Sequence, residues 1–284
     1  MGTDTSKTSP KNSGSAIRQF QFGQGCHDGT QYNFFADDKI FSVRVIDSKD
    51  LHHCSAWLFD GAIHEVVNSD QPMDVIGDTH LHLETAQFKI ASDDEQGSMS
   101  AYSNDQECVF EIEFKTPFTY DWGTPRGASV IHQPLIRATI NYKGVVYESI
   151  GYCKRYWFYE DTDYLAWRFV EGTVDQGRYM LWTADGNFGG DYQKYDYFKI
   201  AYANGRLAQA GDTNSFHRDD AAYSTVEGEE YEVRIEGLGT WTTVIRGAET
   251  QLMLRQRFCR MKVLHGDEVD EGYAINETGV GAIR

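Results

Sequence analysis

The densest group of side chains that could do chemistry lies between Gly151 and Tyr159, in the sequence GYCKRYWFY. Alternate side chains of a β-strand point to opposite faces, so a strand here would place a guanidinium and an indole on one face. We predict that Arg155 orients a carboxylate, enolate or carbonyl oxygen of a substrate, because its planar fork pairs with such oxygens. Two aromatic residues on the same face, Trp157 and Tyr159, would stack on the apolar part of that substrate.

The opposite face of this strand would hold Tyr152 and Lys154. We include both with Arg155 as catalytic candidates, since a phenol and an amine can move protons or polarise an oxygen. The alternative is structural, with Arg155 paired to one of the 43 acidic residues and its aromatic neighbour filling a core. Cys153 and Cys259 are interpreted as small core residues, because no nearby base has the spacing of a catalytic triad.

A second group of polar side chains runs from Asp78 to Glu84, in the sequence DTHLHLE. On a strand, His80 and His82 would share one face with both carboxylates, an arrangement that can bind zinc, iron or manganese. Acid–base work on a substrate is a second use, since imidazole titrates near neutrality. The solvated outer face of an antiparallel strand predicts the same alternation. We therefore predict no bound metal and keep both histidines as substrate-binding candidates.

His132 begins a strand in which it would share a face with Ile136, Ala138 and Ile140. A polar ring on an apolar face is either a hydrogen-bonded core residue or a catalytic group, and we keep His132 as a catalytic candidate. Near the C-terminus, Arg255 and Arg257 share one strand face. This pattern indicates either an anion site or, more commonly, salt bridges to acidic side chains on neighbouring strands.

Most of the remaining chain consists of short segments that alternate apolar and polar residues, for example residues 55–67, 80–90 and 108–114. This is the period of half-buried β-strands. The dipeptide Asn204-Gly205 predicts a tight hairpin, because both turn positions favour positive φ. No segment has the pattern of a capped amphipathic helix. We predict an all-β protein of two antiparallel barrels, or a barrel and a sandwich, after a disordered tail over residues 1–16.

Composition excludes several classes of partner. The chain has 284 residues and a formal net charge of −17, which argues against binding nucleic acid or an anionic membrane surface. No apolar run approaches the roughly 18–20 residues of a membrane span. The five cysteines form no CxxC pair, which is typical of a reduced compartment. We expect a soluble cytoplasmic protein whose partner is a hydrophobic small molecule, and the sequence indicates no oligomeric state.

The stretch from His132 to Phe158 resembles a signature of the lipocalin-like carotenoid 1,2-hydratase superfamily, which includes pericyclic cyclases (Diels–Alderases). Gly151, Tyr152 and Trp157 match its Gly-Tyr-x-Asp-His-x-Trp-Gly pattern. The chain departs from this pattern at three positions, where Lys154 replaces Asp, Arg155 replaces His and Phe158 replaces Gly. A later Ala-Trp-Arg-Phe run, residues 166–169, fits the layout and adds Trp167 as a substrate-binding candidate.

The resemblance implies two lipocalin-like β-barrel domains, over residues 17–155 and 156–284, with a ligand pocket inside a barrel or between the two. It also implies no obligatory organic cofactor. The leading hypothesis is a cofactor-independent hydratase, cyclase or isomerase that acts on a mostly apolar, oxygen-bearing metabolite such as a terpenoid, polyketide or aromatic compound. A non-catalytic carrier of a hydrophobic metabolite and a metal-dependent enzyme built on His80 and His82 are the alternatives. A pocket without ionisable side chains would favour the carrier.

Overall fold

The fold consists of β-strands joined by turns and loops. The computed structural model describes residues 27–47, 51–70, 75–76, 81–93, 95–121, 128–158, 162–188, 193–210, 215–218, 220–249 and 251–283, and these contain no helix. The predicted disordered tail, residues 1–16, lies outside them. Since the described residues are helix-free, they offer no helix that could span a membrane. The all-β prediction is confirmed.

The first sheet forms barrel A and carries twelve strands, in the order β4-β3-β2-β1-β12-β11-β9-β8-β7-β6-β5 with β10 paired to β11. Its paired neighbours are antiparallel. The strands are β1 (His27–Ala36), β2 (Lys39–Asp47), β3 (His52–Phe59), β4 (Ile63–Ser69), β5 (Val75–Ile76), β6 (Leu81–Glu84), β7 (Phe88–Ser92), β8 (Gln96–Tyr102), β9 (Cys108–Lys115), β10 (Tyr120–Asp121), β11 (Ala128–Tyr142) and β12 (Val145–Phe158).

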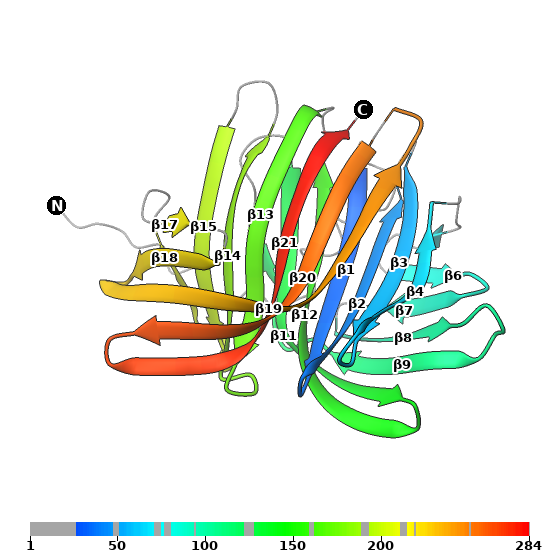
Figure 1. Ribbon diagram of the computed structural model, residues 1–284, viewed down its shortest axis with the longest axis horizontal. Helices are drawn as coiled ribbons and strands as arrows, with labels where there is room; N and C mark the ends of the chain where they lie inside the picture. Colours follow the sequence, from blue (N-terminus) through cyan, green and yellow to red (C-terminus); the bar gives the residue numbers. More distant parts are fainter. Residues whose placement is uncertain are drawn as a thin grey trace.

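The second sheet forms barrel B and carries nine strands, in the order β16-β15-β14-β13-β21-β20-β19-β18-β17. Figure 1 shows the two sheets side by side, with the long strands of barrel B on the left and barrel A on the right. The strands are β13 (Thr162–Val174), β14 (Tyr179–Phe188), β15 (Gln193–Tyr202), β16 (Leu207–Gln209), β17 (Ser215–His217), β18 (Ala221–Val226), β19 (Glu229–Arg246), β20 (Gln251–His265) and β21 (Glu268–Ile283).

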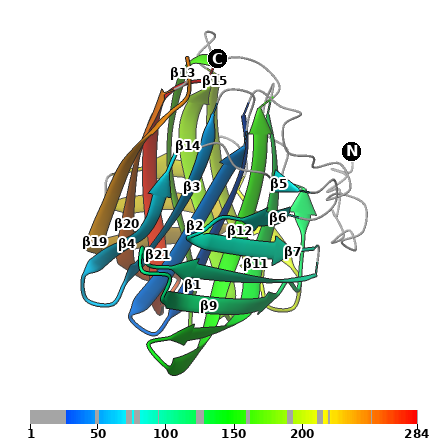
Figure 2. The ribbon, with the colours of Figure 1, turned by 90° about the vertical axis from the view of Figure 1, so that its right-hand side faces the viewer.

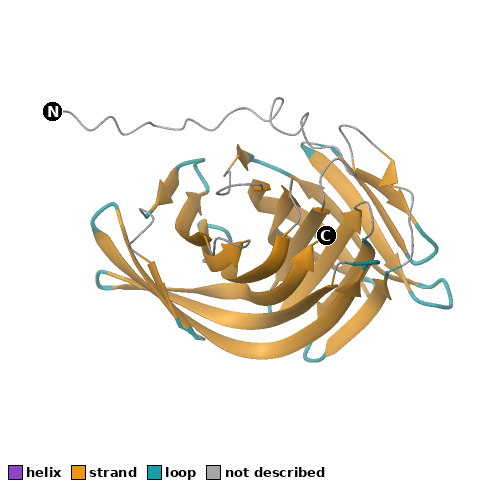
Figure 3. Cartoon of the chain, turned by 90° about the horizontal axis from the view of Figure 1, so that it is seen from above, coloured by secondary structure: helices purple, strands orange, loops and turns teal. Residues whose placement is uncertain are grey.

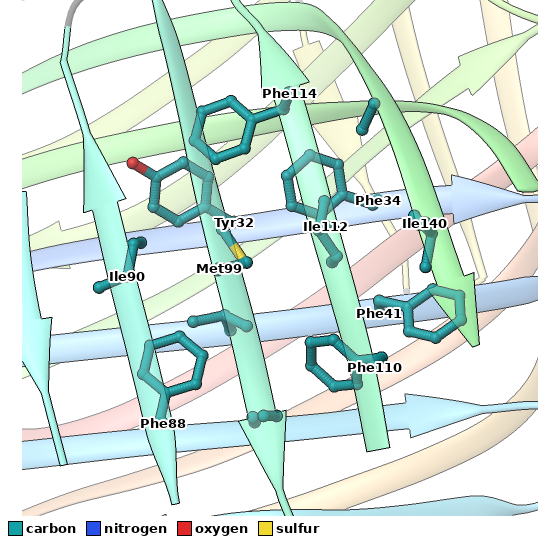
Figure 4. Packing of buried hydrophobic residues seen from close by; sticks show 14 of the residues in the cluster. Tyr32, Phe34, Phe41, Phe88, Ile90, Met99, Phe110, Ile112, Phe114 and Ile140 are labelled. Carbon is teal, nitrogen blue, oxygen red and sulfur yellow. The ribbon is translucent and has the colours of Figure 1, made fainter. Parts of the chain in front are cut away.

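The interior of barrel A is an apolar core in which aromatic rings predominate. Strands β7–β9 cross β1–β3 at a steep angle, and the core side chains lie between these two layers (Figures 2 and 4). Phe41 meets Phe110 edge to face at 5.5 Å between ring centroids, and Tyr32 lies 5.3 Å from Phe114. Side chains alternate between the two faces of each strand. In β6, for example, Leu81 and Leu83 point into this core while His82 and Glu84 are exposed on the outer face.

The two barrels pack on each other through a second apolar cluster. Phe35 and Tyr152 of barrel A meet Phe169, Trp182 and Phe258 of barrel B. Seen from above, the strands form curved layers (Figure 3). The two sheets are therefore joined by a buried apolar layer that is distinct from the cores inside barrel A and barrel B.

The chain passes from one sheet to the other between β12, which ends at Phe158, and β13, which begins at Thr162. The division that we predicted between residues 155 and 156 falls inside β12, where pairing with β1 and β11 continues to Phe158. We propose the interval between Phe158 and Thr162 as the boundary of the two domains.

Candidate active site between the two barrels

A β-bulge in β11 determines where His132 points. The pairing of β11 with β12 slips between Gln133 and Ile136, and Leu135 has a φ of 58°, in the left-handed region. Pro134 lies within the bulge, where its missing N–H costs no ladder hydrogen bond. The extra residue reverses the alternation, so Ile136 packs inside barrel A while His132 lies between the barrels. The prediction that His132 shares a face with Ile136 is therefore wrong.

His132, Lys154 and Glu171 form a buried ionisable cluster. His132 and Lys154 are cross-strand partners on β11 and β12, and Glu171 projects from β13 of the other barrel. His132 Nε2 makes a short hydrogen bond with Glu171 Oε1, and Lys154 Nζ lies 3.3 Å from Glu171 Oε2. The three residues expose between 0% and 5% of their surface, so their charges interact with little screening by water.

Aromatic rings surround this cluster. The Trp182 ring stacks on His132 at 5.7 Å between centroids, and Lys154 Nζ sits 3.0 Å from the centroid of Phe169. A second buried cation, Lys199 Nζ, lies 5.8 Å from the Trp182 ring. The arrangement places aromatic faces beside two ammonium groups, which can stabilise negative charge that develops on an oxygen atom.

Burial sets the protonation state of the cluster. It lowers the pKa of His132 below its ordinary value of 6.5, and the charges of Lys154 and Lys199 act in the same direction against the Glu171 carboxylate. His132 is therefore neutral at pH 7. A neutral ring that donates its Nε2–H to Glu171 holds its lone pair on Nδ1, where it can accept a proton. Burial also lowers the pKa of the Lys154 ammonium, and it raises that of Tyr152 well above 10.

Tyr152 lies beside the cluster and is held by barrel A. Its hydroxyl accepts a hydrogen bond of 2.8 Å from Asn33 Nδ2, and its ring centroid is 5.9 Å from that of His132. Because its pKa is raised, the hydroxyl keeps its proton and can donate it to a substrate oxygen. Tyr152, Lys154 and His132 were all predicted from the sequence, and the structure brings them together.

A separate buried network ties the barrels together further along the interface. Glu277 accepts hydrogen bonds from Gln31 at 3.1 Å, Gln256 at 2.7 Å and Trp167 at 2.9 Å, and forms an ion pair with Arg44. Both carboxylate oxygens are occupied by donors of the protein itself. We interpret this network as structural, which also accounts for the predicted substrate-binding residue Trp167.

The structure separates Arg155 from the other predicted catalytic residues. Arg155 lies inside barrel A, where its guanidinium is 3.3 Å from Ser92 Oγ and 3.5 Å from Tyr32 Oη. Cys153 is on the same buried face, as the alternation predicted. The alternation of side chains along a strand thus correctly predicted which side chains of β12 share a face. The alternation did not show that Arg155 would lie in the interior of barrel A and Lys154 at the interface between the two barrels.

The other predicted residues lie apart from the cluster. His82 is exposed on the outer face of β6, as expected for a solvated strand, and His80 lies outside the described residues. Trp157 belongs to β12, but its side chain is not among those described, and Tyr159 is likewise outside the described residues. Burial raises the thiol pKa of Cys259 to about 11, consistent with a core residue.

One set of potential metal ligands comes together among the described residues, formed by His265, Glu268 and Asp270. Asp270 accepts a hydrogen bond of 2.7 Å from Tyr179 and pairs with Arg178. Protein donors thus already occupy this carboxylate, and the set lies on strands remote from His82.

Sequence reasoning missed Glu171, Trp182 and Lys199, which barrel B contributes. The available signal for Glu171 was a charged residue directly after the apolar pair Phe169-Val170. Such a residue must be solvated or paired, and the structure pairs it.

Comparison with known proteins identifies the fold. No family model and no curated protein sequence matches the chain. Among solved structures, kievitone hydratase from Nectria haematococca superposes with a TM-score of 0.61 over 96% of this chain and 95% of its own, at 13% identity. An AttH-type protein from Nitrosomonas europaea gives 0.55, covering 95% and 98% at 13% identity. CghA in complex with Sch210972 gives 0.53, covering 90% and 88% at 10% identity. The chain therefore shares the fold of these three structures, and the predicted fold of two lipocalin-like antiparallel β-barrels is confirmed.

Proposed function

We propose that the protein is an enzyme that moves protons on a mostly apolar, oxygen-bearing small molecule held between the two barrels, without an organic cofactor. The observation that carries this proposal is the buried cluster of His132, Glu171 and Lys154, contributed by both barrels and lined by aromatic rings. Buried ionisable side chains with shifted pKa values are common at catalytic sites, whereas binding a hydrophobic metabolite requires none. The proposed location is the cytoplasm.

The proposed reaction is the addition of water to a carbon–carbon double bond conjugated with a carbonyl group. His132 Nδ1 would accept a proton from water as the oxygen adds to the β carbon, and Glu171 would stabilise the resulting imidazolium. Lys154 would stabilise the enolate oxygen, helped by the Tyr152 hydroxyl. Return of the proton from His132 to the α carbon completes the hydration. The same groups could catalyse an isomerisation or a cyclisation that passes through an enolate, and the hydratase among the structural neighbours favours hydration.

A survey of enones, isoflavonoids and polyketide-like dienes tests this proposal. Each compound is incubated with the protein, and products are separated and weighed by mass spectrometry in ordinary and ¹⁸O-labelled water. A product heavier by one water that carries ¹⁸O identifies hydration, and a product of unchanged mass with a new retention time identifies isomerisation or cyclisation. Compounds that bind tightly and return unchanged across the survey would make the protein a carrier and overturn the proposal.

The protonation state of His132 predicts the pH dependence of turnover. Because only the neutral ring can accept a proton, kcat/KM is expected to be flat near pH 7 and to fall on the acid side with a midpoint below 6.5. The native state binds this proton less readily than the unfolded chain, so the free energy of unfolding should also decrease as pH falls below about 6.5. Imidazole ¹⁵N chemical shifts, assigned with His132→Gln, measure the same pKa directly. A midpoint above 6.5 for His132 would contradict the assignment.

A further inference from the structure

A groove of about 790 Å³ lies across β19, β20 and β21, near the turn that joins β19 to β20. Its lining includes no residue of the candidate active site. Arg255 pairs in register with Thr242 on one side and Thr278 on the other. Two positions along the same strands, Met253 pairs with Val244 and with a further valine, Val280. Since side chains two apart share a face, one row of this groove is cationic and hydroxylic, and the next row is apolar.

The cationic row has no acidic counterpart. Arg255 belongs to this row, Arg246 lines the groove beyond the apolar row, and Arg257 lies one row away on the other side. Within the described part of the chain none of the three forms an ion pair, and no described lining residue is acidic. Elsewhere in the same sheet, Arg168 pairs with Asp185, and similar pairs engage Arg206 and Arg234. The salt bridges that we expected for Arg255 and Arg257 are thus not made. In a protein of net charge −17, this leaves a local positive site.

The apolar row is exposed to solvent. Met253 exposes 54% of its surface and Val280 exposes 36%, which places both among the large hydrophobic residues that the protein leaves uncovered. Burying this surface under a hydrocarbon chain is favourable in proportion to the area removed from water. The volume of the groove is within the range of small-molecule sites, about 300–1,000 Å³.

From these observations we infer that the groove binds a small amphiphile with one anionic head, such as a carboxylate, sulfonate or sulfate, and a short hydrocarbon chain. The guanidinium of Arg255 holds the head in a charge-assisted hydrogen bond, with hydroxyl donors available from Thr242 and Thr278 on the neighbouring strands. The chain lies over Met253 and Val280 towards Arg246. This site is separate from the proposed reaction, because the groove includes no residue of the candidate active site and the side chains of Arg255 and Met253 lie on the other face of the sheet from Glu171.

Calorimetric titration with three decyl probes tests the inference on the full-length protein. Decanoate is expected to bind, while decanol and decyltrimethylammonium, which share its chain but not its charge, should bind at least tenfold more weakly. Arg255→Gln should weaken decanoate binding about tenfold or more, the usual effect of losing one charge-assisted hydrogen bond. Arg260→Gln is the matched control: it removes the same charge from the opposite face of the same strand, where Arg260 is exposed, and should leave binding unchanged.

The location of the probe is read independently from methyl signals of the six methionines after ¹³C labelling. Decanoate should shift the signal of Met253 and leave that of Met261, in the core of barrel B, in place. Equal binding of all three probes, undiminished binding to Arg255→Gln, or an unchanged Met253 signal at saturation would each overturn the inference. None of these results depends on turnover at the interdomain cluster, so the two proposals fail or succeed separately.

Discussion

Glu171→Gln is expected to reduce kcat by about 10²- to 10⁴-fold, with the native fold retained. The amide keeps the size of the side chain and can still bond to His132, but it carries no charge. It therefore cannot stabilise the imidazolium that forms when His132 accepts a proton, nor balance the charge of Lys154, 3.3 Å away. Losing the carboxylate that orients and supports a catalytic histidine has effects of this size in hydrolases with a catalytic triad.

The measurement is single-substrate kinetics on whichever compound the survey identifies, with thermal unfolding to verify the fold. Glu271→Gln is the matched control, because Glu271 is exposed on β21 and pairs with the exposed Lys262. His132→Gln should cause a similar loss, and the double variant should be scarcely worse than either single one, since the two residues act as a unit. If Glu171→Gln kept a kcat within threefold of the native value, the cluster would be structural and the proposed mechanism would be wrong.

The faces of β12 were predictable, and their environments were not. Alternation places Cys153 and Arg155 together and Tyr152 and Lys154 together whatever the fold. In a single barrel, one of these faces would be core and the other solvent. Here both are buried, because the outer face of barrel A is covered by barrel B. A local pattern contains no information about this covering by the second barrel. The sequence therefore left both a substrate-orienting and a structural role open for Arg155, and the structure places its guanidinium beside Ser92 and Tyr32 inside barrel A.

The position of His132 depends on an irregularity that the sequence signals only weakly. A proline in a strand indicates a bulge or an edge, and Pro134 was such a signal. The next residue, Leu135, adopts a positive φ and packs in the layer between the barrels, and neither feature is indicated by the local sequence. Glu171 was harder still, since it is 39 residues from His132 and on another sheet. Contacts of that range follow from how the barrels dock.

That docking rests on a polar network as well as on apolar packing, and Glu277→Leu is expected to destabilise the protein by about 3–5 kcal/mol. The substitution leaves the guanidinium of Arg44, which is 4% exposed, without its carboxylate and leaves three neutral donors unsatisfied. A buried charge that loses its partner typically costs this much. At roughly 2–4 °C per kcal/mol for a protein of about this size, the Tm should fall by about 10 °C.

Urea unfolding measures the loss, and a second variant separates charge from packing. Arg44→Leu/Glu277→Leu removes both charges, so its loss should be clearly smaller than that of Glu277→Leu, because replacing a whole buried pair is far less costly than breaking it. Glu268→Leu, on the same strand but exposed, should change stability by less than about 0.5 kcal/mol. A double variant as unstable as Glu277→Leu would instead assign the effect to the hydrogen bonds from Gln31, Gln256 and Trp167. In either case the lost interactions are ones that hold the two barrels together. The same docking of the barrels brings Glu171 to His132.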